Sequence, residues 1–442
     1  MESWKQVDPL MYRQGEAVLQ TLVAHNFEAY FVGGCVRDEI MGREVHDMDI
    51  ATSARPEQVI ELFDRTVPTG IQHGTVMVLM GDYSFEVTTF RKESEYEDHR
   101  RPSRVEFVDA IIEDLQRRDF TMNAMASGLD GRLIDPFGGR EDIAAGLIRC
   151  VGQAGERFEE DALRMMRAIR FASVFGFRPV KSLWRALIAG RGRLSFVAME
   201  RIRAEFERVI EGPRPLRGLA LIQRSGVINE VKYPVSARGP FRESYIRAME
   251  HPLVSGQVKR LYLLLRGLNI HAEKAEGLMR QWTFSNRIVE RTTKLISFDE
   301  QWLDRRFALS PADQQDIKEL RRAWIMLELA YGSETVVNWL ECHQALLQEV
   351  AQASYPVPEW KRPAELDILN RLLDQAREWH EGMTVYELRD LAIAGSDVIQ
   401  CTGNKGGPWL GQLMKQMLES VAMGEMVNDR EVLLKHVKDV VN

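Results

Sequence analysis

The sequence predicts an α+β protein with a small mixed N-terminal head and a long helical remainder. Runs with the composition and alternation of β-strands are confined to the first part of the chain, at 28–33, 47–52, 75–80 and 84–90. Helical apolar spacing fills Pro9–His25 and about 56–64, and from Gly155 it continues almost to the end. At 442 residues the chain exceeds one ordinary hydrophobic core, so several domains are expected.

The composition is that of a globular protein, with 45% hydrophobic and 28% charged residues. The net charge of −7 does not favour a nucleic-acid partner, but polyanion binding depends on a local basic surface rather than on the total. The four cysteines lie far apart with no Cys-x-x-Cys pair, which argues against a zinc site or disulfide framework. The chain starts without the apolar core of a signal peptide, and its apolar stretches are too short or too charged to span a bilayer. We therefore expect a cytoplasmic protein.

The most informative stretch combines a glycine turn with a pair of acidic residues. Gly33 and Gly34 follow a short buried strand and precede a helical segment, where the backbone can approach a bound phosphate closely. Asp47 and Asp49 are two residues apart, so in a strand both carboxylates project from the same side. Like charges at that distance repel unless a cation lies between them, and this predicts a Mg²⁺ site. A solvated Asx turn is the alternative for Asp-x-Asp alone.

Glu86 lies on the strand expected at 84–90 and is a candidate for a third metal-binding carboxylate. An ordinary exposed strand glutamate explains it equally well. The turn before this strand, at Gly81-Asp82, predicts a β-hairpin with the strand at 75–80. Beyond it, residues 92–103 are polar and charged, and we expect a loop there.

A second cluster follows at Arg117-Arg118-Asp119, with Asn123 four residues beyond Asp119. Paired guanidinium groups suit triphosphate oxygens. Asp119 and Asn123 have the polarity to hold a ribose hydroxyl and are spaced to share one face of a helical turn. A capped and salt-bridged helix start is the alternative interpretation.

The stretch from Glu160 to Arg170 predicts one helix, in which Asp161, Arg164, Arg167 and Arg170 recur every three residues. A carboxylate and a guanidinium one turn apart can read a base edge. Asp161 would accept from the amino group of cytosine or adenine, while Arg164 donates to the ring nitrogen beside it. Guanine and uracil present the reverse polarity and would leave both charges unpaired. The alternative is a surface ion pair worth roughly a few tenths of a kcal/mol.

These motifs resemble, in their order along the chain, those of the class II tRNA nucleotidyltransferases, which comprise the CCA-adding enzymes and their poly(A) polymerase relatives. The resemblance covers roughly residues 28–210. It rests on Gly33-Gly34-x-x-Arg37-Asp38, Asp47-x-Asp49, Arg117-Arg118-Asp119, Asp135-Pro136-x-Gly138-Gly139, Glu160-Asp161-x-x-Arg164 and Glu200-Arg201-Ile202-Arg203. It implies a polymerase-β-like nucleotidyltransferase head at 1–148, followed by an all-helical neck (149–211), body (212–330) and tail (331–442).

The resemblance also implies residue roles. Asp47 and Asp49 become Mg²⁺ ligands and the catalytic pair, and Asp161 and Arg164 become the protein template for CTP and ATP. The remaining nucleotide-binding positions that it implies, or that their polarity suggests, are Gly33, Gly34, Arg37, Arg118, Asp119, Asn123, Arg167 and Arg170.

The implied reaction is template-independent CCA addition to tRNA, with two metal ions assisting attack of the 3′-hydroxyl and release of pyrophosphate. The acceptor arm would bind the body and tail through its phosphates. Family members that stop after two cytidines look shortened at the 92–103 loop, which this chain retains. Addition of A alone and poly(A) synthesis remain alternatives, as does a catalytically silent RNA-binding protein. No membrane and no protein partner are indicated.

Overall fold

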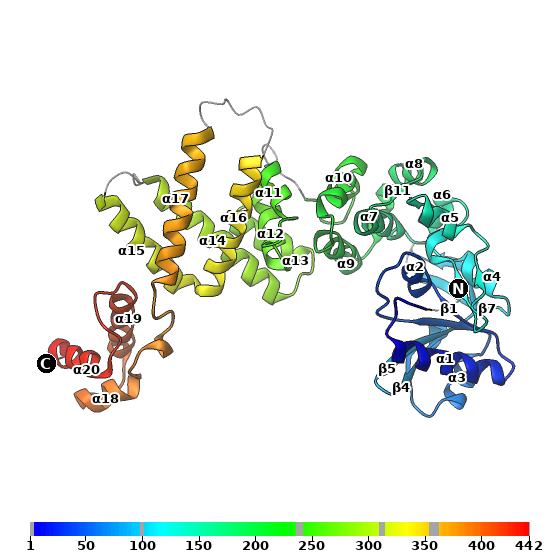
Figure 1. The fold of residues 1–442 in the computed structure, drawn as a ribbon, viewed down its shortest axis with the longest axis horizontal. Coiled ribbons are helices and arrows are strands. Elements are labelled where there is room, and N and C mark those ends of the chain that lie inside the picture. Colours follow the sequence, from blue (N-terminus) through cyan, green and yellow to red (C-terminus); the bar gives the residue numbers. More distant parts are fainter. Residues whose placement is uncertain (1–3, 98–100, 236–241, 309–313, 353–361, 442) are drawn as a thin grey trace. The chain divides into compact units, whose positions relative to one another are not determined.

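A computed structural model of the chain describes residues 4–97, 101–235, 242–308, 314–352 and 362–441 (Figure 1). The chain forms two compact units, Met1–Val235 and Ser236–Asn442. The strands and the candidate site lie in the first unit, whereas the second is helical. The predicted α+β class is confirmed, and the finer division into head, neck, body and tail stays a prediction.

The first unit is built on a seven-stranded sheet with the strand order β3-β4-β5-β2-β1-β8-β9. The neighbours β2 and β5 run parallel, while the other adjacent pairs in this sheet run antiparallel. Its strands are β1 (Ala29–Val32), β2 (Asp49–Thr52), β3 (Thr66–Gly70), β4 (Thr75–Met80), β5 (Tyr83–Thr89), β8 (Ala126–Ser127) and β9 (Leu133–Ile134).

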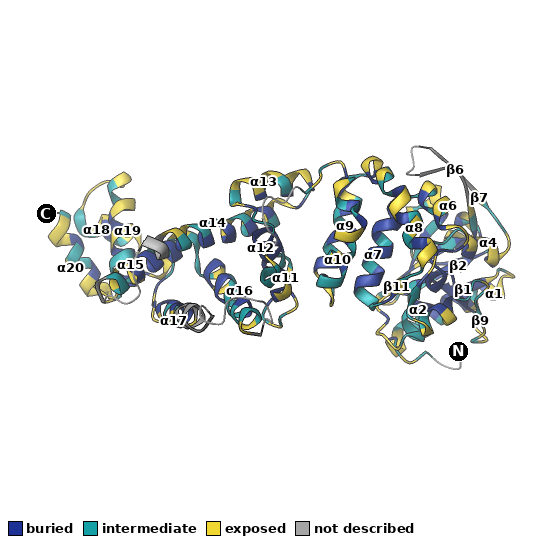
Figure 2. Ribbon diagram, turned by 90° about the horizontal axis from the view of Figure 1, so that it is seen from above, coloured by how far each residue is buried: buried dark blue, intermediate teal, exposed yellow. Residues whose placement is uncertain are grey.

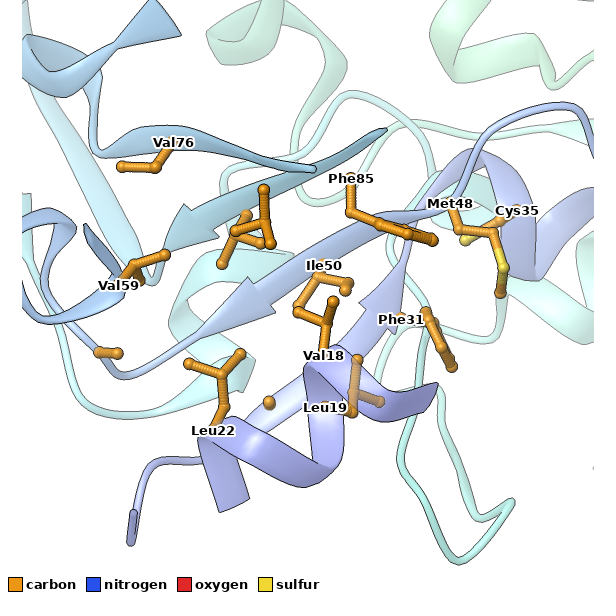
Figure 3. Close-up of a cluster of buried hydrophobic side chains, with 14 of the residues drawn as sticks. Val18, Leu19, Leu22, Phe31, Cys35, Met48, Ile50, Val59, Val76 and Phe85 are labelled. Carbon is orange, nitrogen blue, oxygen red and sulfur yellow. The ribbon is translucent and has the colours of Figure 1, made fainter. Parts of the chain in front are cut away.

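One face of the sheet is covered by α1 (Pro9–Ala24) and α3 (Pro56–Leu62). Their apolar stripes pack on alternate residues of the strands, and Figure 3 shows Val18, Leu22 and Ile50 within this core. Met48 belongs to the same buried cluster. Because strand side chains alternate, a Met48 side chain on this face places its two acidic neighbours on the opposite face.

The opposite face carries a second buried cluster that includes Val32, Ala51, Phe90 and Leu115. Leu115 comes from α4 (Ile111–Gln116), and the chain then passes through the 3₁₀-helix η2 (Thr121–Asn123) into β8. The helix α2 (Gly34–Ile40) follows β1 directly. The middle strands are therefore buried on both faces, which fixes the positions of the residues at their ends.

The remaining elements of the first unit form a mostly helical layer. They are α5 (Gly139–Ala144), β10 (Leu147–Ile148), α6 (Ala154–Glu160), α7 (Arg164–Phe175), β11 (Arg178–Pro179), α8 (Lys181–Gly190), η3 (Arg191–Phe196), α9 (Met199–Ile210), α10 (Pro215–Ser225) and η4 (Val227–Asn229). In Figure 2, α7 is mostly buried while α8 presents exposed residues. The carbonyl of Val174, near the end of α7, accepts from Arg214, and the carbonyls of Ala172 and Phe177 accept from Arg217.

Two local predictions are wrong. The expected loop at 92–103 contains the antiparallel strands β6 (Arg91–Glu97) and β7 (Arg101–Phe107), and residues 98–100 lie outside the described residues. The register places Lys92 opposite Glu106, and opposite charges on facing residues stabilise a strand pair.

The single helix expected from Glu160 to Arg170 is also interrupted. Helix α6 ends at Glu160, Asp161 is extended with φ −145°, and α7 begins at Arg164. The Asp161 carboxylate accepts from the backbone N–H of Leu163 at 3.0 Å. Such local side-chain bonds compete with helix continuation.

The second unit is helical wherever the structure describes regular elements. These are α11 (Glu243–Ala248), α12 (Gln257–Gly267), α13 (Ala272–Gln281), α14 (Asn286–Ala308), α15 (Gln314–Tyr331), α16 (Ser333–Gln352), α17 (Arg362–Glu381), η5 (Leu388–Asp390), α18 (Gly395–Thr402), α19 (Pro408–Ala422) and α20 (Arg430–Val441). Trp302, Trp324 and Phe298 are buried together in edge-on contacts. The buried Asp299 beside them accepts from Arg266 and from the Trp339 indole. Among the described helices, none combines the length and apolarity needed to cross a membrane.

Gly218 on α10 allows close contact with α7 and α9, and its replacement by alanine should destabilise the first unit. A Cβ there would lie 2.3 Å from Val209 Cγ1 and 2.8 Å from Ser173 Oγ. Because a valine side chain in a helix has little rotamer freedom, we expect a loss of about 1–3 kcal/mol in urea unfolding followed by circular dichroism. Gly155→Ala is the control, since no atom lies within 4 Å of its Cβ position. An equal loss in both variants would contradict the packing argument.

Candidate active site

The site begins at the turn between β1 and α2. Gly33 has φ +74° and ψ −119°, a conformation that other residues rarely adopt. A Cβ on Gly33 would lie 2.6 Å from Arg118 Nη1, so the glycine also makes room for a guanidinium group. The buried Nε of Arg118 has no hydrogen-bond partner among the described residues. An orphaned cationic donor beside a glycine turn is suited to an anion.

The two predicted catalytic carboxylates lie next to this turn. Asp49 is the first residue of β2 and pairs in register with Val32, while Asp47 precedes the strand and is exposed. The parallel pairing of Ile50 with Val87 brings Glu86 alongside Asp49. Burial raises the pKa of Asp49 to about 6, with the negative charges of Asp47 and Glu86 adding to the shift and Arg118 opposing it. The structure therefore brings three acidic side chains into one electrostatic cluster.

The donor chemistry of this cluster fits a hard divalent cation. Carboxylate oxygens are its preferred ligands, and Mg²⁺ in nucleotide sites takes one or two carboxylates, with water and phosphate oxygens completing the shell. Among the described residues, no group of three or more His, Cys, Asp or Glu side chains is arranged to hold a metal unaided. A cation bound by Asp47 and Asp49 would thus depend on the substrate for further ligands.

Asp119 is the buried centre of a polar network behind the turn. Its Oδ2 accepts from Arg167 Nε at 2.7 Å, and its Oδ1 accepts from Asn123 Nδ2 at 3.0 Å and from the Phe120 backbone at 2.8 Å. Burial would raise the pKa of Asp119, but the Arg167 charge and these hydrogen bonds outweigh it and lower the pKa to about 2. The carboxylate is consequently held ionised.

The network continues to the glycine turn through Asn123. The Oδ1 atom of Asn123 accepts from Arg37 Nη1 at 2.6 Å, and Arg37 also donates to Asp38 at 3.0 and 2.8 Å. The Arg37 guanidinium lies over the rings of Phe171 and Phe175 on α7. Arg37 is buried and thereby joins α2 to α7. Asp119 and Asn123 do make the expected contact, but Asp119 precedes the 3₁₀-helix η2 and does not share a helical turn with Asn123.

The predicted base-reading pair lies at the break between α6 and α7. Asp161 Oδ2 accepts from Arg201 Nη2 at 2.7 Å, while Oδ1 accepts from Leu163. Arg164 is buried and donates to the Glu160 carboxylate and to the Arg157 and Arg117 carbonyls. Each member of the pair is thus oriented by protein groups. Arg170, one turn beyond Arg167, bonds with Glu205 on α9.

Sequence reasoning missed two functional supports. Asp114 on α4 is fully buried and accepts from Arg117 at 2.9 Å and from Arg118 at 3.3 Å. Asp114 lies three and four residues before these arginines, and this spacing in a helix predicts ion pairs between them. Glu205 is 4% exposed and is contacted by Arg167 and Arg170. A partner 35 residues from Arg170 leaves no local sequence pattern.

Comparison with known proteins defines the class. The chain matches the family model "Poly A polymerase head domain" over residues 29–149. It also matches "Probable RNA and SrmB- binding site of polymerase A" over 176–234 and "tRNA nucleotidyltransferase domain 2" over 257–437. Together with the acidic cluster beside a glycine turn, these matches define a nucleotidyltransferase of the poly(A) polymerase type.

The family follows from relatives that align along nearly the full chain. The CCA-adding enzyme of Geobacillus sp. (strain WCH70) is 36% identical over 95% of both chains. That of Enterococcus faecalis is 34% identical over 97% of this chain and 96% of its own. The chain therefore belongs to the family of CCA-adding enzymes, and the resemblance found in the sequence is confirmed.

Solved structures agree with this assignment. The crystal structure of the Bacillus stearothermophilus CCA-adding enzyme in complex with CTP has a TM-score of 0.75 and 30% identity, with 98% of each chain covered. The Thermotoga maritima CCA-adding enzyme complexed with tRNA-CCA shares the fold, with a TM-score of 0.66 and 21% identity over 99% of this chain and 97% of its own.

Asp119 should contribute stability that depends on pH. Because its folded-state pKa of about 2 lies below the usual aspartate value of 3.8, the contribution is fully present well above pH 3.8 and is lost as the pH falls toward 2. At pH 7 we expect Asp119→Asn to be less stable by about 2–3 kcal/mol. Urea unfolding of both proteins from pH 7 to pH 2 measures this difference, which should shrink below pH 4. A difference that is constant over this range would show that Asp119 acts by packing alone.

Proposed function

We propose that this chain adds CCA to the 3′ end of tRNA, with CTP and ATP as substrates and pyrophosphate as the second product. The observation that carries the proposal is the acidic cluster of Asp47, Asp49 and Glu86 beside Gly33 and Arg118, in a chain related along nearly its whole length to CCA-adding enzymes. Four free cysteines support a cytoplasmic location. In this proposal the head, neck, body and tail have the boundaries expected from the sequence, and tRNA binds the body and tail.

Asp47 and Asp49 would hold Mg²⁺. When bound there, the cation would activate the tRNA 3′-hydroxyl and neutralise charge on the departing pyrophosphate. Arg118 would donate to the triphosphate through donors that include the orphaned Nε, and the Gly33-Gly34 backbone would allow the phosphates to approach.

Asp161 and Arg164 would select the base of the incoming nucleotide. Asp161 accepts from an exocyclic amino group and Arg164 donates to the neighbouring ring nitrogen, a pattern that cytosine and adenine share. The proposal also assigns Arg37, Asp119, Asn123, Arg167 and Arg170 to the nucleotide pocket. Their mutual hydrogen bonds and ion pairs would make its wall rigid.

The direct test is incorporation on a tRNA transcript that lacks its 3′ CCA, with Mg²⁺ and each labelled nucleotide in turn. We expect addition of C and then A. Addition of A only on CC-ended tRNA would identify an A-adding enzyme, long A tails would identify a poly(A) polymerase, and no incorporation would favour a silent RNA-binding protein. Any of these three results would overturn the proposal.

The metal assignment predicts that Asp49→Ala lowers the rate of nucleotide incorporation by at least about 100-fold. The affinity for tRNA should stay close to that of the unchanged protein. The carboxylate is a ligand in the proposal and has no role in holding RNA. Incorporation and filter binding measured on the same preparations separate the two effects. Asp82→Ala removes an exposed acid from the β4–β5 turn and is the matched control. Retained incorporation in Asp49→Ala would contradict the assignment.

The template assignment predicts that Arg164→Ala changes nucleotide choice as well as rate. In the proposal, UTP and GTP are rejected because they leave the Arg164 guanidinium unpaired. Without this group, the preference for CTP and ATP over UTP and GTP should fall by at least about tenfold. Ratios of kcat/KM for the four nucleotides give this quantity. Equal losses for all four would mean that Arg164 only supports the fold.

A further inference from the structure

Asp114 on α4 is a buried charged residue to which the proposed reaction gives no role. Its side chain is 0% exposed. The Oδ1 atom accepts from Arg117 Nε at 2.9 Å and from the Arg91 backbone N–H at 3.3 Å, and Oδ2 accepts from Arg118 Nη2 at 3.3 Å. Burial alone would raise the pKa of Asp114, but the charges of Arg117 and Arg118 outweigh it and lower the pKa. The buried carboxylate is therefore ionised.

Arg118 interacts both with Asp114 and with the acidic cluster of the candidate site. Its Nη1 donates to the Asn123 carbonyl at 3.5 Å and lies 2.6 Å from the position of a Cβ on Gly33. The residue before Gly33 is Val32, which pairs in register with Asp49. Burial and the neighbouring acids raise the pKa of Asp49, and the Arg118 charge opposes this shift. The same guanidinium group is thus attracted by two separate acidic groups.

A direct ion pair between Arg118 and Asp49 would hinder the proposed reaction. It would neutralise a carboxylate that the proposal assigns to Mg²⁺, and it would occupy donors that the proposal assigns to the triphosphate. The cation and the phosphates would then have to displace a charge-assisted hydrogen bond before they bind. In the structure Arg118 pairs with Asp114 instead, and its buried Nε has no partner among the described residues.

We propose that Asp114 is a positioning residue for phosphate binding, which holds the Arg118 guanidinium away from Asp49 and leaves its Nε to donate to the triphosphate. The tether is short, because the two residues are one helical turn apart in sequence. It is also rigid, because Arg117 and the Arg91 backbone hold the other oxygen of the buried carboxylate. The inference rests on the proposed function, since it concerns nucleotide binding for the same reaction.

The test uses Asp114→Asn, which keeps the size of the side chain and an acceptor for the Arg91 N–H but removes the charge. We expect the affinities for CTP, ATP and inorganic tripolyphosphate, measured by equilibrium binding with Mg²⁺, to fall together by about tenfold. The ratio of the CTP and UTP affinities should stay unchanged, because the base is read elsewhere. Glu113→Gln is the matched control, since it removes one negative charge from an exposed position on the same helix. We expect it to leave all these affinities unchanged.

A double-mutant cycle with Arg118→Met separates positioning from a general loss of stability. Arg118→Met alone should weaken tripolyphosphate binding. In that background, Asp114→Asn should weaken it by less than about twofold more, because the group that Asp114 positions is absent. A residue that only supports the fold would show its full effect in both backgrounds.

Unfolding midpoints of all variants accompany the binding data. If Asp114→Asn fails to fold, Asp114→Ser takes its place, with the same expected loss of affinity. An unchanged tripolyphosphate affinity in a folded variant, or an equally large loss in the Arg118→Met background, would overturn the inference. Failure of the proposed function is a different result, in which the unchanged protein incorporates neither C nor A. The binding comparison decides the role of Asp114 in that case too.

Discussion

The ion pair between the buried Asp119 and the half-buried Arg167 is the contact on which the rest of the site depends. Through Asn123 it reaches Arg37 and hence the helix after the glycine turn, and through Arg167 it reaches α7, whose first residue is Arg164. Removing one partner of such a pair leaves a buried charge uncompensated, which is far more costly than losing a surface bridge. The same carboxylate therefore connects the glycine turn before α2 with the start of α7.

Much of the fold could be predicted from the sequence because its local signals agree with its tertiary packing. The strands at 29–32, 49–52, 75–80 and 83–89 and the first helix all lie close to their expected positions. Short elements such as β8 and β9 were missed, since two-residue strands have no periodicity to detect. The region of β6 and β7 was predicted to be a loop because charged residues dominate its sequence, whereas the structure pairs the two strands in antiparallel register.

In the candidate site, too, features formed by residues close in sequence could be predicted, whereas contacts between residues far apart in sequence could not. The sequence predicted that Asp47 and Asp49 project from the same side, and the structure buries Met48 between them. The sequence also predicted the glycine turn. The sequence could not indicate that Arg37 turns away from solvent to pack on Phe171 and Phe175, nor that Arg201 and Glu205 supply the counter-charges of the Asp161–Arg170 segment. Those contacts join residues tens of positions apart, and they depend on how helices pack rather than on the pattern within any one helix.

The long sequence separations within this site bear on how the protein is made. A nascent chain leaves the ribosome N-terminus first, so β1, β2 and β5 can emerge and pair while α9 is still unsynthesised. Arg167 is 48 residues behind its Asp119 partner, and Arg201 is 40 residues behind Asp161. An unfinished polypeptide that ends before α9 contains Asp47 and Asp49 but lacks Arg201, which bonds to Asp161, and Glu205, which bonds to Arg170. The counter-charges of Asp161 and Arg170 are therefore the last part of the first unit's candidate site to be translated.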